Sequence, residues 1–350
     1  MSRIPVTILG ATGVVGQRFV RRLVDHPLFE IRHLAASDRS TGKTYEEACA
    51  WRLGGEPYAG LSKQTLVAAH PDQAQAPLVF SALDATPAKE IEPLYAATGS
   101  LVFSNASAFR MAPDVPLLVP EANADHLGLI ESQRRARGWK GGIVCNANCT
   151  ATVLVMGLAP LQQAFGIERV FMTSMQALSG AGYPGVPSLD ILGNVIPFIK
   201  SEEEKVEEET PKMLGRFTGT TVSPADFKMS AICNRVPVLD GHSESVSVTL
   251  RGTPSVVQVI EAFTAWRGDP RVAKLHSAPA VPIRVHASEA RPQVRLDVDT
   301  DSGMSVHVGR VRPCPLLGIK FHLVGHNAER GAAGASVLNA ELAHALGYLQ

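Results

Sequence analysis

The stretch that decides the fold is PVTILGATGVVGQRFVRRL, residues 5–23. A short β-branched run ends at Gly10, Gly13 and Gly16 follow, and apolar residues then recur with the period of a helix. A strand, a glycine turn and a helix in this order open a nucleotide-binding unit, in which Gly10 permits the tight turn and Gly13 lets a pyrophosphate approach the helix N-terminus. The spacing G-x-x-G-x-x-G is not the strict dinucleotide fingerprint, so a plain strand-to-helix turn remains the alternative.

Strand and helix patterns alternate outward from this stretch to about residue 150, and the run VPLLVPEAN, residues 115–123, is one of the predicted strands. This alternation predicts a parallel, doubly wound sheet. The later sequence alternates with period two, as antiparallel strands do. We therefore predict a Rossmann-like domain over residues 1–149, completed by the C-terminal helix 327–350, and an α+β domain over residues 150–326. Within the second part the predicted strands are 169–179, 244–252, 293–300, 304–313 and 318–327, a charged helix is predicted at 201–214, and 180–198 reads as a Gly/Pro-punctuated loop.

The composition excludes several classes of protein. Lys plus Arg balance Asp plus Glu at 33 each, so bulk charge gives no attraction to nucleic acid or to a membrane. The N-terminus shows no secretory signal and no apolar run reaches bilayer length, so we expect a cytoplasmic protein. Five cysteines are too few, and odd in number, for a disulfide framework, and no ligand pair accompanies Cys145 and Cys149, so we predict free thiols and no metal site.

The end of the second predicted strand bears on the choice of cofactor. An NAD enzyme usually places a carboxylate here for the ribose hydroxyls. This chain reads AASDRSTGKTY, in which Ser37, Arg39, Ser40 and Lys43 can form a phosphate nest. The pattern favours NADP(H). Two alternatives remain open: Asp38 could face the ribose, and Lys43 could belong to a solvated polar turn.

Cys149 stands directly before the apolar run TATVLVMGLAPL, a predicted helix. A thiol at a helix N-terminus gains stabilisation of its thiolate from the dipole and the free N–H groups, and these N–H groups are also candidate donors for an oxyanion. The best partner is His242, in a glycine-bearing turn, with His326 as the runner-up. Spacing alone does not decide between this pair and a packed, inert thiol, which is the commoner state of a free cysteine.

Long runs of the chain resemble the aspartate-semialdehyde dehydrogenases, particularly the branch typical of archaea and fungi. The resemblance covers essentially the whole length. It is carried by GATGVVGQRF, SNASAFRM, VPEAN, NANCTAT, MQALSGAGYPGVPSLDILGNVIPFI, EEEK, RVPVLDGHSESV and VGRVRPCP, in that order. One departure is Lys200-Ser201, where a glycine pair is expected before the acidic run. The resemblance implies the two-domain architecture that these enzymes share with glyceraldehyde-3-phosphate dehydrogenase, with catalysis and dimerisation in the second domain.

The resemblance also implies roles for individual residues. Cys149 matches the nucleophile, His242 the acid–base group and Gln176 the glutamine that places the reacting groups. Glu202 looks like the ligand of the substrate ammonium and Arg235 like the clamp on its α-carboxylate, with Arg110, Asn148 and Lys205 as the phosphate-binding set. Glu203 competes with Glu202, which we prefer because an i, i+3 pair with Lys205 lies on one helical face. The predicted cofactor-binding set is Gly10, Thr12, Gly13, Val14, Val15, Gly16, Ser37, Arg39, Ser40, Lys43, Ser81, Asn105, Gly180 and Asn327.

The activity implied is the reversible, NADP-dependent reductive dephosphorylation of 4-phospho-L-aspartate to L-aspartate 4-semialdehyde through a Cys149 thioester. It would serve lysine, threonine, methionine and isoleucine synthesis, in a homodimer or homotetramer. Sibling reductases that act on malonyl-CoA or N-acetyl-glutamyl phosphate are the alternative, which Glu202 together with Arg235 disfavours, since neither substrate offers an ammonium beside a carboxylate. A non-catalytic nucleotide sensor is the alternative from another class, but it would not need Cys149, Gln176 and His242.

Overall fold

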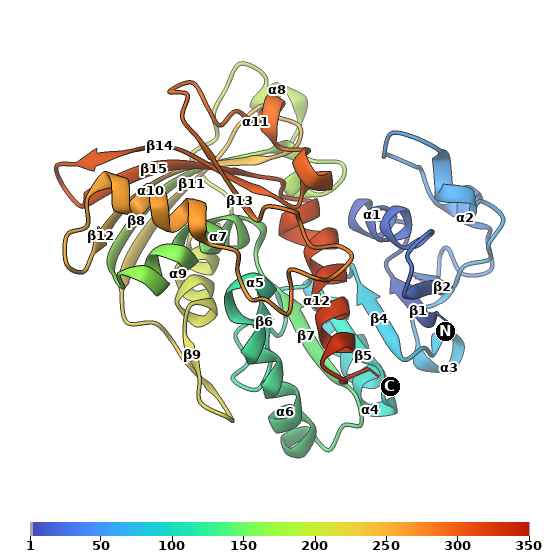
Figure 1. Cartoon of the computed structure of the whole chain (residues 1–350). Helices are drawn as coiled ribbons and strands as arrows, with labels where there is room; N and C mark the ends of the chain where they lie inside the picture. Colours follow the sequence, from blue (N-terminus) through green and yellow to red (C-terminus); the bar gives the residue numbers. More distant parts are fainter. Residues whose placement is uncertain (1–2, 350) are drawn as a thin grey trace.

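The computed structural model describes residues 3–349, which form two lobes, each built on one large sheet (Figure 1). The first sheet has the strand order β3-β2-β1-β4-β5-β7-β6 and is parallel throughout. Its strands are β1 (Ile4–Leu9), β2 (Phe29–Ala36), β3 (Val67–Ala68), β4 (Leu78–Ser81), β5 (Leu101–Ser104), β6 (Leu117–Leu118) and β7 (Gly142–Asn146). The connecting helices are α1 (Val14–Leu23), α2 (Tyr45–Ala48), α3 (Pro71–Ala74), α4 (Ala85–Thr98), α5 (Pro120–Asn123) and α6 (Leu129–Arg137), with short 3-10 turns at Pro57–Gly60 and Ala124–Gly128.

The second sheet is mixed, with the order β11-β8-β12-β15-β14-β13. Its outer pairs, β11 with β8 and β13 with β14, are parallel, whereas the inner pairs are antiparallel. The strands are β8 (Ile167–Gln176), β11 (Lys228–Arg235), β12 (His242–Leu250), β13 (Ile283–His286), β14 (Val306–Cys314) and β15 (Gly318–Gly325), and a separate ribbon pairs β9 (Arg216–Phe217) with β10 (Val222–Ser223). The helices are α7 (Cys149–Ala164), α8 (Ser188–Ile191), α9 (Glu202–Met213), α10 (Val256–Ala265), α11 (Val294–Asp297) and α12 (Gly334–Ala345), with 3-10 turns at Leu178–Ala181 and Thr300–Gly303 and a π-helical turn at Glu329–Ala333.

Two helices follow the points at which the chain passes from one lobe to the other. The first, α7, is buried along nearly its whole length because it is apolar all round, and it packs on β8, β12, β14 and β15. After β15 the chain returns to the first lobe, where α12 contacts β5 and β7 (Figure 1). The apolar side chains of α12 belong to the same buried cluster as those of β1 and α1. The predicted domain limits at residues 149 and 327 remain a prediction, but this packing explains why the last helix completes the first core.

Two predicted strands are wrong. Residues 293–300 form helix α11 and the start of a 3-10 turn, because Asp297 caps the backbone N–H of Gln293 and because Val294 and Val298 lie four residues apart against Gly241. The predicted run 115–123 is a strand only at Leu117–Leu118 and then becomes α5, which Pro120 opens. Three elements of the second lobe, β11, β13 and α10, were not predicted from the sequence.

One buried carboxyl in the first lobe makes stability depend on pH. Glu92 on α4 is fully buried, accepts a hydrogen bond from the Ser104 hydroxyl at 2.6 Å, and burial raises its pKa to about 7. Between its usual value of 4.5 and about 7 the folded state holds one more proton than the unfolded chain, so stability falls as pH rises through this window and is level above it.

We expect Glu92→Gln to remove this dependence. Its free energy of unfolding, relative to that of the native chain, should therefore be higher at pH 8 than at pH 5 by roughly 2.5 kcal/mol. Chemical denaturation at both pH values measures the difference. Glu90→Gln, an exposed position on the same helix, is the control. Equal pH dependence in the native chain and Glu92→Gln would contradict the assignment.

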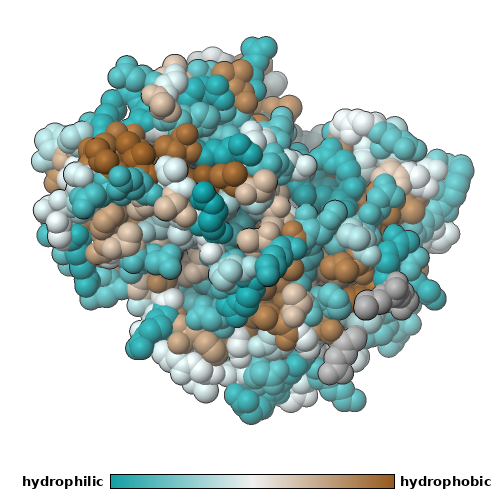
Figure 2. All heavy atoms as spheres, in the orientation of Figure 1, coloured by the Kyte–Doolittle hydropathy of each residue, from teal (hydrophilic) through white to brown (hydrophobic). Residues whose placement is uncertain are grey.

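The surface in Figure 2 is mostly hydrophilic and carries separate apolar groups, the largest on the lobe of the second sheet. None of the helices within residues 3–349 combines the length and the apolar character that crossing a bilayer requires.

Candidate active site

The residue that opens α7 is Cys149, and its sulfur lies 3.2 Å from Nε2 of His242, at the start of β12. The thiol keeps some exposure, whereas His242 is fully buried. Burial and the nearby Glu202 carboxylate raise the pKa of the Cys149 thiol to about 12, while Arg110 and Arg235 act in the opposite direction. Both arginines therefore favour the thiolate, whereas burial and Glu202 favour the neutral thiol.

The hydrogen bonds of His242 assign its tautomer. The backbone N–H of Ala177 donates to Nδ1 at 3.2 Å, so in the neutral ring the proton lies on Nε2, which faces Cys149. Burial, together with the charge of Arg235, lowers the pKa of His242 to about 3, so the ring is neutral at physiological pH. The ring can therefore donate a hydrogen bond to a thiolate or to an oxyanion beside it.

A row of side chains across the second sheet continues from this pair. Gln176 ends β8 opposite Arg235 on β11, and both are buried. Arg235 donates from Nη1 to the carbonyl oxygen of Ala177 at 2.7 Å. Gly180 closes over the row, since a Cβ atom there would lie 2.9 Å from Nη1 of Arg235 and 3.2 Å from Cε1 of His242. The structure thus places Gly180 beside the reacting groups.

A carboxyl group without a hydrogen-bond donor among the described residues lies on β12, close in sequence to His242. Glu244, two residues after His242 on β12, is fully buried, and within residues 3–349 no donor reaches either of its oxygens. Burial, together with the neighbouring Glu202, raises its pKa well above the ordinary value, so both effects favour the protonated, neutral form. Sequence analysis did not single out this residue.

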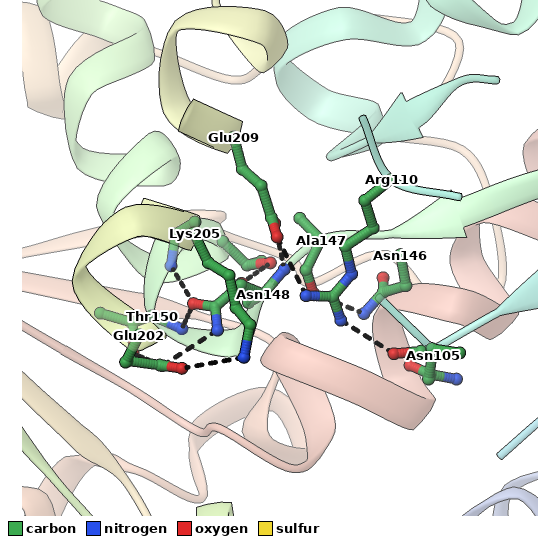
Figure 3. A network of polar contacts seen from close by, with 12 residues as sticks. Asn105, Arg110, Asn146, Ala147, Asn148, Thr150, Glu202, Lys205 and Glu209 are labelled. Atoms are coloured by element: carbon green, nitrogen blue, oxygen red, sulfur yellow. Dashed lines mark hydrogen bonds and ion pairs between the residues drawn. The ribbon is translucent and has the colours of Figure 1, made fainter. Parts of the chain in front are cut away.

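Glu202 and Glu203, the two candidates for the ammonium ligand, lie in different surroundings. Glu202 is buried and accepts hydrogen bonds from Nδ2 of Asn148 at 2.9 Å and from the Thr150 hydroxyl at 3.2 Å (Figure 3). Glu203 instead accepts from the backbone N–H of Cys233 on the edge strand β11. The structure therefore brings Glu202, and not Glu203, close to Cys149.

The side chain of Asn148 caps α7 as well as contacting Glu202. Its side-chain oxygen caps α7 by accepting from the backbone N–H groups of Thr150 and Ala151 at 2.9 and 3.0 Å. These two N–H groups are consequently not free oxyanion donors, which corrects our expectation for the start of this helix.

One stripe of α9 faces the site (Figure 3). Its members, spaced three or four residues apart, are Glu202, Lys205, Glu209 and Lys212. Lys205 remains partly exposed, with Nζ 3.9 Å from Glu202. Glu209 reaches Arg110, which comes from the loop after β5, at 3.1 Å. Glu209 and Lys212 were missed, although their spacing from Glu202 and Lys205 was visible in the sequence.

The glycine loop fits a cofactor pyrophosphate. Gly10 has a φ of +73°, and a Cβ atom at Gly16 would lie 2.2 Å from the Gly10 carbonyl oxygen, so both positions require glycine. Gly13 is exposed and starts α1, which has neither a side-chain cap nor an acidic residue in its first turn. Its N–H groups are thus available to an anion, with Thr12, Val14 and Val15 half-buried around them.

The other predicted cofactor residues divide into two groups. Ser37, Arg39, Ser40 and Lys43 follow β2, the neighbour of β1, and are exposed or partly exposed. Ser81, Asn105 and Asn327 are less accessible. Ser81 is fully buried, so its side chain offers no surface to a cofactor, and Asn105 donates to its carbonyl oxygen. Asn327 accepts from the Gly241 N–H at 2.7 Å and donates to the Ser179 hydroxyl at 2.8 Å, which braces the turn before His242.

Comparison with known proteins covers nearly the whole chain. The family model "semialdehyde dehydrogenase, NAD binding domain" matches residues 5–130, and "semialdehyde dehydrogenase, dimerisation domain" matches residues 158–328. The aspartate-semialdehyde dehydrogenase of Archaeoglobus fulgidus is 51% identical over 340 residues, which cover 97% of this chain and 98% of that protein. The chain belongs to the aspartate-semialdehyde dehydrogenase family.

Solved structures give the same result. The Candida albicans aspartate-semialdehyde dehydrogenase with NADP superposes with a TM-score of 0.91 at 40% identity, covering 99% of this chain and all of that one. The Vibrio cholerae aspartate-semialdehyde dehydrogenase II complexed with ASA gives 0.76 at 26% identity, covering 98% and 99%. The expected family, the parallel-sheet nucleotide domain and the presence of a dimerisation domain are thus confirmed.

Two polar features of this dehydrogenase lie apart from Cys149. A cavity of about 730 Å³ lies beside α1 and is lined by Arg21, Arg22 and His276 among others. A second cluster joins His286, His307 and Asp297, with Nε2 of His286 2.9 Å from Nδ1 of His307. The two ring centroids are 5.2 Å apart. This distance is nearly the sum of the nitrogen–nitrogen distance and the two centroid-to-nitrogen distances, so centroids and nitrogens lie almost on one line. The two nitrogens therefore point at each other and not at a common metal position.

One further glycine, Gly331, lies in close contact with Cys149. A Cβ atom at Gly331 would lie 2.6 Å from the Cβ atom of Cys149. We expect Gly331→Ala to displace Cys149 from His242 and to lower turnover about ten-fold or more, with about 1–3 kcal/mol of lost stability. Steady-state kinetics and chemical denaturation measure both effects. Gly54→Ala is the control because nothing lies within 4 Å of its added methyl group. Native activity in Gly331→Ala would show that the close contact is not needed.

Proposed function

We propose that this chain catalyses the NADP-dependent reductive dephosphorylation of 4-phospho-L-aspartate to L-aspartate 4-semialdehyde, and the reverse reaction, through a thioester on Cys149. The observation that carries the proposal is the 3.2 Å contact between Cys149 Sγ and His242 Nε2, with Arg235 and Glu202 held around it. An amino-acid substrate offers a carboxylate and an ammonium, and these two side chains have the complementary charges.

In the proposed reaction, Cys149 bonds to the substrate and His242 stabilises the negative charge that develops. The Cys149 thiolate attacks the acyl carbon and phosphate leaves, which gives the thioester. When bound, NADP(H) supplies the hydride that reduces the thioester. The resulting thiohemiacetal oxyanion reforms a carbonyl by expelling the thiolate, and the Nε2 proton of His242 is placed to stabilise both anions. The proton on Nε2 supports this donor role, and on this basis we propose His242 as the acid–base group.

The substrate groups are recognised by fixed side chains. We assign the α-carboxylate to Arg235, whose planar fork suits bidentate binding, and the ammonium to Glu202. The phosphate is assigned to Arg110 and Lys205. Asn148 contributes through the position of α7 and of Glu202, since its own side chain is already hydrogen-bonded.

NADP selectivity is proposed to come from the turn after β2. We expect Arg39→Ala to raise the KM for NADP⁺ about ten-fold and to leave that for NAD⁺ unchanged, because only the former carries the additional phosphate. Steady-state kinetics with both cofactors measures this. Arg32→Ala, exposed on β2 itself, is the control, and equal effects of Arg39→Ala on both cofactors would contradict the assignment.

We also propose that the protein acts as a homodimer or homotetramer. The dimerisation domain is present, and the segment 180–200 exposes large apolar side chains that an interface would cover. These are Tyr183, Leu189, Leu192, Val195 and Phe198.

The test of the proposed function is NADP⁺ reduction with L-aspartate 4-semialdehyde, measured at the nicotinamide absorbance band with and without phosphate. We expect turnover that requires phosphate and is far weaker with NAD⁺. Absence of turnover in folded, reduced protein would refute the substrate, and coenzyme A thioesters would then test the sibling reductases.

A further inference from the structure

The carboxylate of Glu209 connects two parts of the phosphate site (Figure 3). Its Oε1 accepts from Nη1 of Arg110 at 3.1 Å, and its Oε2 accepts from the backbone N–H of Asn148 at 2.6 Å. Only 2% of Glu209 is exposed, so both bonds lie in a region of low dielectric. One side chain thereby fixes the arginine and the residue directly before the nucleophile.

The charge of Glu209 also matters to Arg110. The arginine is 8% exposed, and burial alone would lower its pKa, but the Glu209 carboxylate reverses this effect and the pKa is raised. A buried guanidinium without a counter-charge would be strongly destabilising. Because phosphate is absent between turnovers, Glu209 supplies the charge that keeps Arg110 in place at that stage.

The same helix also holds the loop that carries Arg110. Nζ of Lys212, one turn after Glu209, donates to the carbonyl oxygens of Arg110, Ala112 and Val115 at 2.6, 2.8 and 3.1 Å. The Asn105 carbonyl accepts from Nη2 of Arg110 at 2.8 Å. Both the backbone and the guanidinium of Arg110 are thus held by hydrogen bonds. Glu209 connects the guanidinium to the start of α7, because it also accepts from the Asn148 N–H.

From these contacts we infer that Glu209 is a positioning residue for the phosphate step: it presets the Arg110 guanidinium in the geometry that receives phosphate and, through the Asn148 backbone, fixes the start of α7 beside it. This inference rests on the proposed function. The neutral isostere would not replace the carboxylate, because a glutamine amide can accept from only one of the two donors and would turn its own N–H₂ group toward the other.

The experiment compares Glu209→Gln, Arg110→Lys and the double variant in the phosphate-dependent oxidation of L-aspartate 4-semialdehyde by the full-length protein. We expect Glu209→Gln to raise the KM for phosphate by about ten-fold or more, with the KM for the semialdehyde and the affinity for NADP⁺ unchanged. Because Glu209 acts through Arg110, adding Glu209→Gln to Arg110→Lys should raise the KM little further. Glu208→Gln, exposed on the same helix, is the matched control.

The outcomes separate this inference from the proposed function. A phosphate KM within two-fold of the native value in Glu209→Gln, or effects that multiply fully in the double variant, would overturn the inference while the function stands. A native enzyme that needs no phosphate would instead overturn the proposed function. If Glu209→Gln does not fold, Glu209→Asp replaces it in the experiment, because its carboxylate is too short to bridge both donors. A selective rise in the KM for phosphate then supports the inference, and an unchanged KM overturns it.

Discussion

Replacement of Cys149 by alanine is expected to reduce phosphate-dependent NADP⁺ reduction by at least about 10⁴-fold and to leave cofactor affinity nearly unchanged. The reason is that the sulfur is the only atom of the site that the proposed reaction bonds covalently to substrate. The glycine loop that would hold the pyrophosphate begins about 140 residues earlier, on another element, and does not depend on this side chain. Steady-state assays and a cofactor titration measure the two effects.

Cys149→Ser is expected to be nearly as inactive, because a serine hydroxyl needs a base to form its anion, whereas the neutral His242 presents its Nε2 proton to the sulfur. Cys314→Ala is the control, since this cysteine lies on β14 in the outer part of the second sheet. Appreciable turnover in Cys149→Ala would exclude the nucleophile assignment.

The second large effect is expected from Arg235→Lys. This arginine is 5% exposed, and its Nη1 already donates to Ala177. A lysine there could not bond the backbone and a substrate carboxylate in the same planar arrangement. Loss of a charge-assisted hydrogen bond corresponds to roughly 1.5–3 kcal/mol, so the KM for the semialdehyde should rise about ten- to hundred-fold.

Kinetics with varied semialdehyde and saturating phosphate measure the Arg235→Lys effect. The phosphate KM should change much less, because Arg235 is assigned to the α-carboxylate alone. Arg312→Lys, an exposed position on β14, controls for loss of an arginine as such. An unchanged semialdehyde KM in Arg235→Lys would refute the clamp.

The first lobe was predictable because its signals are local. The β1 run, the glycines and the helical stripe of α1 are contiguous, and each strand of a parallel sheet is a short apolar run. The second lobe was harder. Residues 293–300 alternate like a strand, yet Asp297 and the contacts of Val294 with Gly241 favour a helix. Those contacts join segments far apart in the chain, which no local pattern reports.

The site shows the same division. Cys149 and His242 carried individual signals, a helix start and a glycine turn, but their 3.2 Å contact depends on how β12 packs on α7. Glu209 carried a signal that was not used, since it continues the spacing of Glu202 and Lys205 on α9. Gly331 carried none, because its contact with Cys149 depends on the return of the chain from the second lobe to the first.

The central claim, a thioester on Cys149 that phosphate resolves, is tested most directly by mixing enzyme with L-aspartate 4-semialdehyde and NADP⁺ in the absence of phosphate. We predict a burst of one equivalent of NADPH per active site, a mass increase of one aspartyl group on the peptide that contains Cys149, and release of that group when phosphate is added. Sustained turnover without phosphate, or a burst with no modification of Cys149, would contradict the account.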